Sequence, residues 1–409
     1  MATPTADCTN AAVRPLDGVR VLDLTRLLPG AYATLLMADL GADVVKIEDP
    51  RGGDATRGMP PGYFEILNRN KRSATLDLRS PEAAAVLDAL VSHADVLVES
   101  FRPHTSRRLG VDAQTLRARH PRLVYASITG FGQTGPYAER AAHDINYEAL
   151  SGLLMASASS ASTHDPPQMP RMLVADVGAA MNAAAGILAA LFQRERTGAG
   201  AAVDVSIHES ALSWLLFPAA RQLVFDRDAG DNASVHAREL PIHGRDACYN
   251  IYRTADGEYV ALGALEPKFW SAFCEGVGRP DLIPLHDAQG DDQARVLADV
   301  RALMQTRTRD EWLARFSGID ICLTPVNSVA GALRDPHIAA RGAVVQQGGS
   351  VYVTTPIAVT DTTTDEGWRG ARRVDVQPAP ALGAHTDDVL RDAGFAAAEI
   401  ARLRGRGVI

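Results

Sequence analysis

The sequence predicts an α/β protein: a large domain built on a parallel sheet with helices on both faces, and a smaller α+β domain after it. Short apolar strands alternate with helical segments through the first third of the chain, as is typical of doubly wound sheets. A strand, a helix and a second strand fit within residues 19–48, so we expect parallel pairing with a right-handed crossover. From residue 247 the pattern changes to a hairpin followed by helices.

The elements of the large domain are predicted from short apolar runs and the residues that interrupt them. A strand at 19–24 precedes the pair Pro29-Gly30, and a helix at 31–40 ends before Gly41, a residue type that commonly follows helices. No GxGxxG follows the first strand, so an ordinary dinucleotide site is not expected. The other expected strands are 43–48, 95–99, 123–128 and 203–207, and the other expected helices are 81–94, 115–119, 177–196, 209–222 and two segments within 386–403.

The smaller domain is predicted to begin with a β-hairpin. Two apolar runs, 249–252 and 259–262, are separated by a turn at Asp256-Gly257. The helices expected after it are 267–277, 294–305 and 309–316. The resulting domain plan is a large domain at 15–225 plus 360–409, a linker at 226–246, a small domain at 247–330 and a return linker at 331–359, with a mobile loop at 157–170.

The length and composition are those of an ordinary globular protein. Its 409 residues are 46% hydrophobic and 22% charged, with a formal net charge of −8, which argues against a nucleic-acid partner. The four cysteines are scattered without metal-binding or disulfide spacing, so we expect free thiols and no metal site. The start of the sequence lacks a signal-peptide pattern, and the apolar stretch 178–192 is short for a membrane span. We therefore expect a cytoplasmic protein without a membrane partner.

Three residues stand out as candidates for acid–base chemistry. His143 lies beside an aspartate before an apolar helix, and histidine is the natural general base at neutral pH. Asp176 comes immediately before a long helix, whose N-terminus stabilises negative charge. Glu266 lies between a strand and a helix that starts at Pro267. For each of the three, a structural helix cap is the alternative interpretation.

Basic residues are concentrated near the ends of expected strands, where open α/β sheets place their ligands. Two of three clusters lie just beyond strand ends, which favours a polyphosphate site over solvated surface charge. The clusters are Lys46, Arg51 and Arg57; Arg69, Lys71 and Arg72; and Arg102, Arg107 and Arg108.

Several ordered motifs resemble the class III CoA-transferase family, which includes α-methylacyl-CoA racemases. They are the opening Pro15-Leu-Asp-Gly-Val-Arg-Val-Leu-Asp-Leu24, Leu40-Gly-Ala-Asp-Val-Val-Lys-Ile-Glu48, Asn68-Arg-Asn-Lys-Arg-Ser73, Gly130-Phe-Gly-Gln-Thr-Gly-Pro136 and Leu382-Gly-Ala-His-Thr386. The resemblance extends from about Pro15 to Ile409. It implies a Rossmann-like large domain and an interlocked homodimer, whose active site lies between the large domain of one chain and the small domain of the other.

The resemblance also implies coenzyme A as the bound group, carried by an acyl-CoA substrate, with no cofactor beyond it. By matching position, the residues near the nucleotide phosphates or adenine would be Lys46, Arg72, Arg102 and Arg108. Tyr147 would lie near the pantetheine.

Two activities within the family remain open. The transferases share one catalytic aspartate, matched by Asp176, which forms an aspartyl-CoA thioester while CoA moves between carboxylic acids. The racemases use that aspartate as a base together with a histidine, matched by His143, and a supporting glutamate, matched by Glu266. With all three positions filled, the resemblance favours a racemase that inverts the α-carbon of a 2-methylacyl-CoA thioester. CoA transfer is the alternative, and residues 52–57 are more similar to that branch.

Overall fold

The computed structural model describes residues 14–60, 62–157, 167–229, 244–360 and 376–409. Most of the loop expected at 157–170 lies outside these residues. The chain divides into two compact units, one formed by residues 1–219 with 337–409 and the other by residues 220–336. The candidate site described below lies entirely within the first unit.

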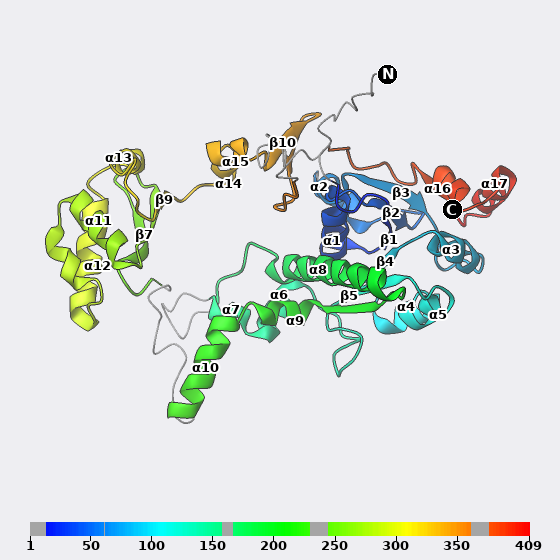
Figure 1. Cartoon of the computed structure of the whole chain (residues 1–409), viewed down its shortest axis with the longest axis horizontal. Helices are drawn as coiled ribbons and strands as arrows, with labels where there is room; N and C mark the ends of the chain where they lie inside the picture. The colour runs from blue at the N-terminus through cyan, green and yellow to red at the C-terminus, as the bar shows by residue number, and fades with distance from the viewer. Residues whose placement is uncertain (1–13, 61, 158–166, 230–243, 361–375) are drawn as a thin grey trace, which may run out of the picture. The chain divides into compact units, whose positions relative to one another are not determined.

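The first unit is built on a six-stranded parallel sheet with the strand order β3-β2-β1-β4-β5-β6 (Figure 1). The strands are β1 (Arg20–Leu24), β2 (Asp43–Glu48), β3 (Lys71–Thr75), β4 (Val96–Glu99), β5 (Val124–Thr129) and β6 (Ala202–Ser206). This order is that of the doubly wound dinucleotide-binding folds, and it confirms the predicted parallel α/β architecture. The order reverses between β1 and β4, which lie next to each other.

Helices lie between the strands and after them, and several of these helices cover the two faces of the sheet. They are α1 (Leu27–Asp39), the 3₁₀ helix η1 (Ala55–Gly58), α2 (Tyr63–Asn68), α3 (Ala83–Ser92), α4 (Pro103–Leu109), α5 (Ala113–Arg119), α6 (Asp144–Ser151), α7 (Leu153–Ala156), α8 (Val174–Thr197), α9 (Ile207–Ser213), α10 (Leu216–Ala229), α16 (Thr386–Asp392) and α17 (Ala397–Gly405).

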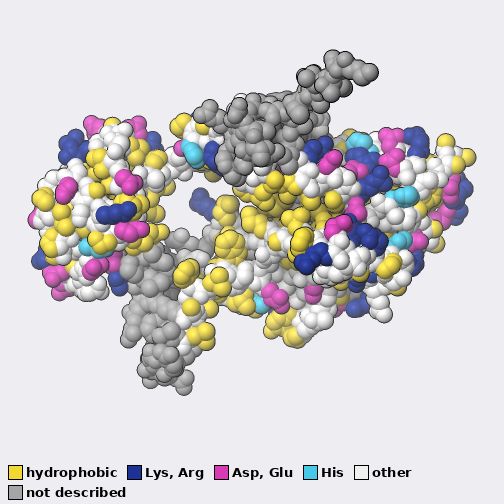
Figure 2. Space-filling model, in the orientation of Figure 1, with side chains coloured by type: hydrophobic (Ala, Val, Ile, Leu, Met, Phe, Trp, Pro, Cys, Tyr) yellow, Lys and Arg dark blue, Asp and Glu magenta, His cyan; other side chains and the backbone are white. Residues whose placement is uncertain are grey.

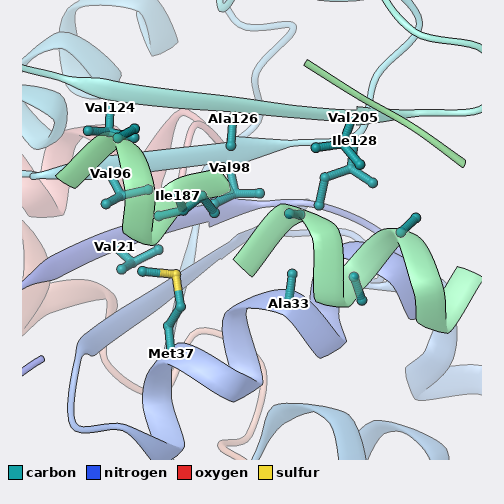
Figure 3. Packing of buried hydrophobic residues seen from close by; sticks show 14 of the residues in the cluster. Val21, Ala33, Met37, Val96, Val98, Val124, Ala126, Ile128, Ile187 and Val205 are labelled. Atoms are coloured by element: carbon teal, nitrogen blue, oxygen red, sulfur yellow. The ribbon is translucent and has the colours of Figure 1, made fainter. Parts of the chain in front are cut away.

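One face of the sheet packs against α1 and α8. Figure 3 shows Met37 of α1 and Ile187 of α8 against the valines of the strands. Helix α8 is long and apolar enough to cross a membrane by length and composition alone, but half of its most apolar window is buried within the fold. Ala179 and Ala183 are fully buried and bring the helix close to the sheet. The helix therefore serves as core, and its first turn lies at a fixed place beside the sheet.

The opposite face is covered by α3, α16 and α17, with Leu87, Leu390 and Leu403 in its core. The two helical segments predicted within 386–403 are thus present and complete the large unit.

Strand β3 was missed by the sequence analysis because its residues, Lys71-Arg-Ser-Ala-Thr75, look like exposed polar chain. The Lys71 side chain is buried, and its Nζ donates to Asp23 Oδ2 (3.2 Å), Ala31 O (2.9 Å) and Asn68 Oδ1 (3.0 Å). Burial lowers the pKa of Lys71 to about 8. A basic side chain is thus accommodated in a sheet because acceptors distant in sequence surround it.

The second unit contains the predicted hairpin and its helices. Strands β7 (Tyr249–Arg253), β8 (Tyr259–Gly263) and β9 (Leu323–Pro325) form an antiparallel sheet. Trp270, Phe273 and Trp312 are at its core. The helices are α11 (Pro267–Val277), the 3₁₀ helix η5 (Pro280–Leu285), α12 (Gly290–Met304), α13 (Arg309–Arg315) and α14 (Val329–Ala332).

The range expected as a return linker, 331–359, contains regular structure. It includes α15 (Pro336–Ala340) and an antiparallel hairpin of β10 (Val344–Gln347) and β11 (Ser350–Val353). The side chain of Tyr352 is buried, while the other residues of β11 are exposed, so the segment offers little apolar periodicity to sequence reasoning.

Candidate functional site

A cavity of about 720 Å³ lies at the carboxyl ends of the parallel strands. Its walls come from the segments that follow β1, β4, β5 and β6, together with the first turns of α6 and α8. In open parallel sheets, ligands bind where the strand order reverses, which here is between β1 and β4. Arg26 and Arg102, from the two segments that leave these strands, both line the cavity. Its position and lining identify this cavity as the candidate active site.

Asp176 lines the cavity from the first turn of α8. The sequence analysis placed it before the helix, with a possible role as its cap; this was wrong, because α8 begins at Val174 and the cap position is Leu173. The backbone N–H of Asp176 donates to Asp144 Oδ1 at 2.9 Å, so that amide is satisfied by another helix. Burial and the nearby Asp144 charge raise the pKa of Asp176 to about 7. The carboxyl group is therefore poised to exchange a proton near neutral pH.

His143 lines the same cavity from the start of α6, where it occupies the cap position. Its backbone N–H donates to Asn146 Oδ1 at 3.0 Å. The imidazole makes no cap hydrogen bond among the described residues, and the side chain is exposed. The cap interpretation thus holds for the backbone position of His143, while its ring is left available to the cavity.

Tyr147 is an aromatic residue that lines the cavity. Its hydroxyl donates to Ala142 O at 3.1 Å, and its ring meets Phe131 edge to face with centroids 5.4 Å apart. Burial and the charge of Asp176 raise the pKa of Tyr147 to about 12, so the phenol is neutral at physiological pH. A Cβ on Gly130 would lie 2.5 Å from the Tyr147 hydroxyl oxygen, so this position of the Tyr147 ring requires glycine there.

A second, smaller cavity of about 230 Å³ borders the first and shares Arg26, Phe101 and Thr105 with it. Arg108 lines this second cavity. The guanidinium of Arg26 lies over the Phe101 ring, 5.6 Å from its centroid. The two cavities therefore adjoin at the three shared residues and are called the depression below; Arg102 lines the first cavity and Arg108 the second.

Lys46 and Arg72, the other two predicted phosphate ligands, line neither of these cavities. The Lys46 side chain is buried, with its Nζ 2.9 Å from Asp54 Oδ2 and 3.8 Å from Asp23 Oδ2. Arg72 pairs with Asp43 instead, with 2.6 Å between Nη2 and Oδ2. Of the five predicted CoA-binding residues, the fold brings Arg102, Arg108 and Tyr147 to the depression.

Glu266 belongs to the second unit. It occupies the cap position of α11 but makes no side-chain cap hydrogen bond. Its predicted support of His143 stays a prediction. In the part of the chain that the structure describes, no three His, Cys, Asp or Glu side chains are grouped as metal ligands.

The sequence analysis did not single out Glu148. Its side chain is buried on the same helix as Asp144, and its pKa is raised to about 7 by burial and by Asp144. The signal was present in the spacing of Asp144 and Glu148, since residues four apart share one face of a helix.

Comparison with known proteins agrees with this geometry. The model of "CoA-transferase family III" matches residues 16–386. The alpha-methylacyl-CoA racemase of Homo sapiens is 34% identical over 408 residues, covering 96% of this chain and 97% of the relative. The succinyl-CoA:mesaconate CoA-transferase of Haloarcula hispanica is also 34% identical, over 93% of this chain and 96% of the relative.

A solved structure of a CAIB/BAIF family protein from Brucella suis superposes with a TM-score of 0.76 at 30% identity, covering 93% of this chain and 99% of that one. The chain therefore belongs to the CoA-transferase family III. A racemase and a transferase are each 34% identical to it, so these identities leave the reaction open between the two.

Proposed function

We propose that this protein is a racemase or epimerase that inverts the α-carbon of a 2-methylacyl-CoA thioester by two-base proton transfer. The observation that carries the proposal is that His143 and Asp176 line one cavity. Inversion requires one proton-transferring group on each face of the substrate carbon. The raised pKa of Asp176, about 7, suits a general base at neutral pH.

In this reaction Asp176 removes the α-proton of one epimer, and the electron pair moves into the thioester carbonyl to form an enolate. Protonated His143 then delivers its proton to the opposite face, and the two residues exchange roles in the reverse direction. The enolate oxygen needs preorganised donors, each typically worth about 3 to 4 kcal/mol. The amides of Asp144 and Ile145 open α6 and have no acceptor within their own helix, so they suit this role.

The acyl-CoA would lie along the depression, with Arg102 and Arg108 toward its phosphates and Tyr147 beside the pantetheine arm. All three side chains line the cavities described above. Glu266, from the small unit, would hydrogen-bond the His143 imidazole and fix its orientation. The protein would need no cofactor beyond the CoA of its substrate.

We also propose the interlocked homodimer implied by the family resemblance. Apolar side chains are exposed at the end of α9 and the start of α10, and this region carries yellow surface in Figure 2. They are Leu212, Trp214, Leu216 and Phe217. Large apolar side chains exposed so close together in the chain are typical of an interface between chains.

CoA transfer between carboxylic acids is the second candidate, favoured by the equal identity to a transferase. Here the Asp176 carboxylate attacks the thioester carbonyl and releases CoA thiolate, forming a mixed anhydride. The thiolate then attacks the aspartyl carbonyl, releasing the first acid and leaving an aspartyl-CoA thioester. An acceptor carboxylate attacks that thioester, which releases CoA thiolate and forms a second mixed anhydride. The thiolate then attacks the acceptor's carbonyl, which yields the new acyl-CoA and frees the Asp176 carboxylate.

The deciding experiment incubates one epimer of a 2-methylacyl-CoA with the protein in heavy water, without any acceptor acid. A racemase gives α-deuterium by mass spectrometry together with the opposite epimer by NMR. No exchange, followed by CoA transfer once a carboxylic acid is added, would make the protein a transferase.

The variant His143→Ala separates the roles further. It should abolish inversion, since the second face then has no proton donor. Undiminished epimerisation by His143→Ala would refute the assignment of His143. The transferase reaction predicts instead an acylated Asp176 that hydroxylamine traps in both the wild type and this variant.

A further inference from the structure

Two carboxyl groups on α6, those of Asp144 and Glu148, lie near the first turn of α8. Asp144 Oδ1 accepts from the Asp176 N–H at 2.9 Å, and Glu148, one turn further along α6, is buried beside the Asp144 carboxyl. The residue at the cap position of α8, Leu173, offers no side-chain acceptor. The Asp176 amide in the first turn of α8 is therefore held by α6 and not by a side-chain cap.

The Glu148 side chain is almost completely buried, at 3% exposure. Its Oε1 atom has no hydrogen-bond donor within the described structure. A buried carboxylate oxygen without a donor is costly, whereas a carboxylic acid can donate its own proton to a neighbouring carboxylate. The Asp144 carboxyl is that neighbour. One shared proton thus satisfies both groups without any further residue.

We propose that Glu148 is a positioning residue for Asp176: it shares one proton with Asp144, and together they fix the first turn of α8 and limit the negative charge facing Asp176. The proposal rests on the proposed use of Asp176 in catalysis, and it applies equally if Asp176 transfers a proton or attacks a thioester. Glu148 itself lines neither cavity, so it would act through Asp176 and not on the substrate.

Among the described residues, few titratable groups other than Glu148 could change the charge that faces Asp176. On α6 itself they are His143, Asp144 and Tyr147. Helix α8 contributes Asp176, and α7 contributes none. Helix α9, which also packs against α6, carries His208 and Glu209. Only Asp144 and Asp176 are among the influences that raise the pKa of Glu148 to about 7.

The test compares Glu148→Gln with the wild type through the pH profile of kcat/KM for α-deuterium exchange or, should the protein be a transferase, for CoA transfer. In the wild type, two coupled carboxyl groups titrate near neutrality, which spreads the acid limb over two steps. Glutamine can donate to Asp144 but does not ionise. The acid limb of Glu148→Gln should therefore become a single step and move to lower pH, with kcat at high pH within about threefold of wild type.

Glu148→Ala leaves the Asp144 carboxyl without this partner, so the first turn of α8, which Asp144 holds through the Asp176 amide, should shift. We expect kcat to fall by about 10²-fold, as for other misplaced catalytic groups, and Glu148→Gln to restore it. The control Glu209→Gln removes the same charge from an exposed side chain on α9 and should leave the profile unchanged.

A Glu148→Gln profile that superimposes on the wild-type profile would overturn the proposal. So would loss of kcat in Glu148→Gln as severe as in Glu148→Ala, in protein with a wild-type melting curve. An infrared carbonyl band of a buried protonated carboxylic acid should be present in the wild type near pH 6 and weaker in Glu148→Gln. A wild-type protein that neither exchanges the α-proton nor transfers CoA would refute the proposed function instead, and the infrared band would still test the shared proton.

Discussion

The backbone N–H of Asp176 donates a hydrogen bond to Oδ1 of Asp144, with 2.9 Å between the two atoms. This contact joins the first turns of α8 and α6 and keeps two carboxyl groups close together in a partly buried place. Burial and like charge both disfavour the ionised form of Asp176, which is why its pKa rises to about 7. The same contact that orients the side chain thus also sets its basicity.

The first prediction concerns activity against pH. Because Asp176 must be ionised to take a proton, kcat/KM for α-proton exchange should fall below about pH 7. Well below that pH it should drop about tenfold for each pH unit. Stopped assays across pH 5 to 9 with saturating and limiting acyl-CoA measure this limb.

Asp144→Asn is the matched control for that profile. It retains an oxygen that can accept from the Asp176 amide but removes the neighbouring charge, so the limb should move to lower pH. A wild-type limb centred near pH 4 would contradict the assignment of Asp176 as the base.

The second prediction concerns stability against pH. A carboxyl group whose pKa is higher in the folded than in the unfolded protein binds more protons when folded, so its contribution to stability declines as pH rises. For Asp176 the window runs from its ordinary value of 3.8 to about 7. Asp176→Asn removes this decline. Its melting temperature should exceed that of the wild type at pH 8, and the difference should disappear near pH 4.

Although Asp176→Asn should be more stable at pH 8, its activity should fall by about 10² to 10⁴-fold, since an amide is not a base. A variant that is inactive and less stable at pH 8 would mean that the side chain serves the fold, against the assignment made here.

The sequence analysis anticipated most strands and helices because apolar runs and breakers mark them clearly. It missed β3, whose Lys71 is buried only because Asp23 and Thr34, from other elements, meet its ammonium. No local pattern contains that information. For the same reason Lys46 was expected at the phosphates, whereas the fold places it against Asp54.

The sequence analysis predicted which residues form the site, but not how they are arranged in space. His143 and Asp176 were singled out from the sequence, and the fold brings them to one cavity. The hydrogen bond that links their helices joins Asp144 and Asp176, which are 32 residues apart in the chain. Glu148 was missed because a glutamate in an amphipathic helix is ordinarily solvated. Its burial depends on α8 and α9 packing over α6, which only the three-dimensional structure establishes.

The third prediction concerns recognition of CoA. Arg102 is exposed, lines the main cavity and caps α4 by its backbone, so its side chain is available to a phosphate. Arg102→Gln should raise KM for acyl-CoA by about tenfold or more, the value of a charge-assisted hydrogen bond, and leave kcat nearly unchanged. Arg196→Gln, an exposed arginine in the last turn of the same helix as Asp176, is the control and should leave KM as it is. An equal change in both variants would mean that only overall charge matters.

The fourth prediction separates stability from substrate binding at Lys46. Its side chain is 1% exposed, and its Nζ donates to Thr25 O at 3.0 Å and pairs with Asp54. Lys46→Met leaves two buried carboxylates without this cation. We therefore expect a loss of about 3 to 5 kcal/mol in the free energy of unfolding, the usual cost of breaking a buried ion pair, measured by urea denaturation.

Lys268 provides the comparison, since it is an exposed lysine in the second unit whose ammonium lies over the Phe269 ring. Lys268→Met should change the free energy of unfolding by no more than about 0.5 kcal/mol. If Lys46→Met instead keeps wild-type stability and raises KM for acyl-CoA, then Lys46 reaches the phosphates after all, as the family resemblance implied. That outcome would require the Asp54 pair to open when substrate binds.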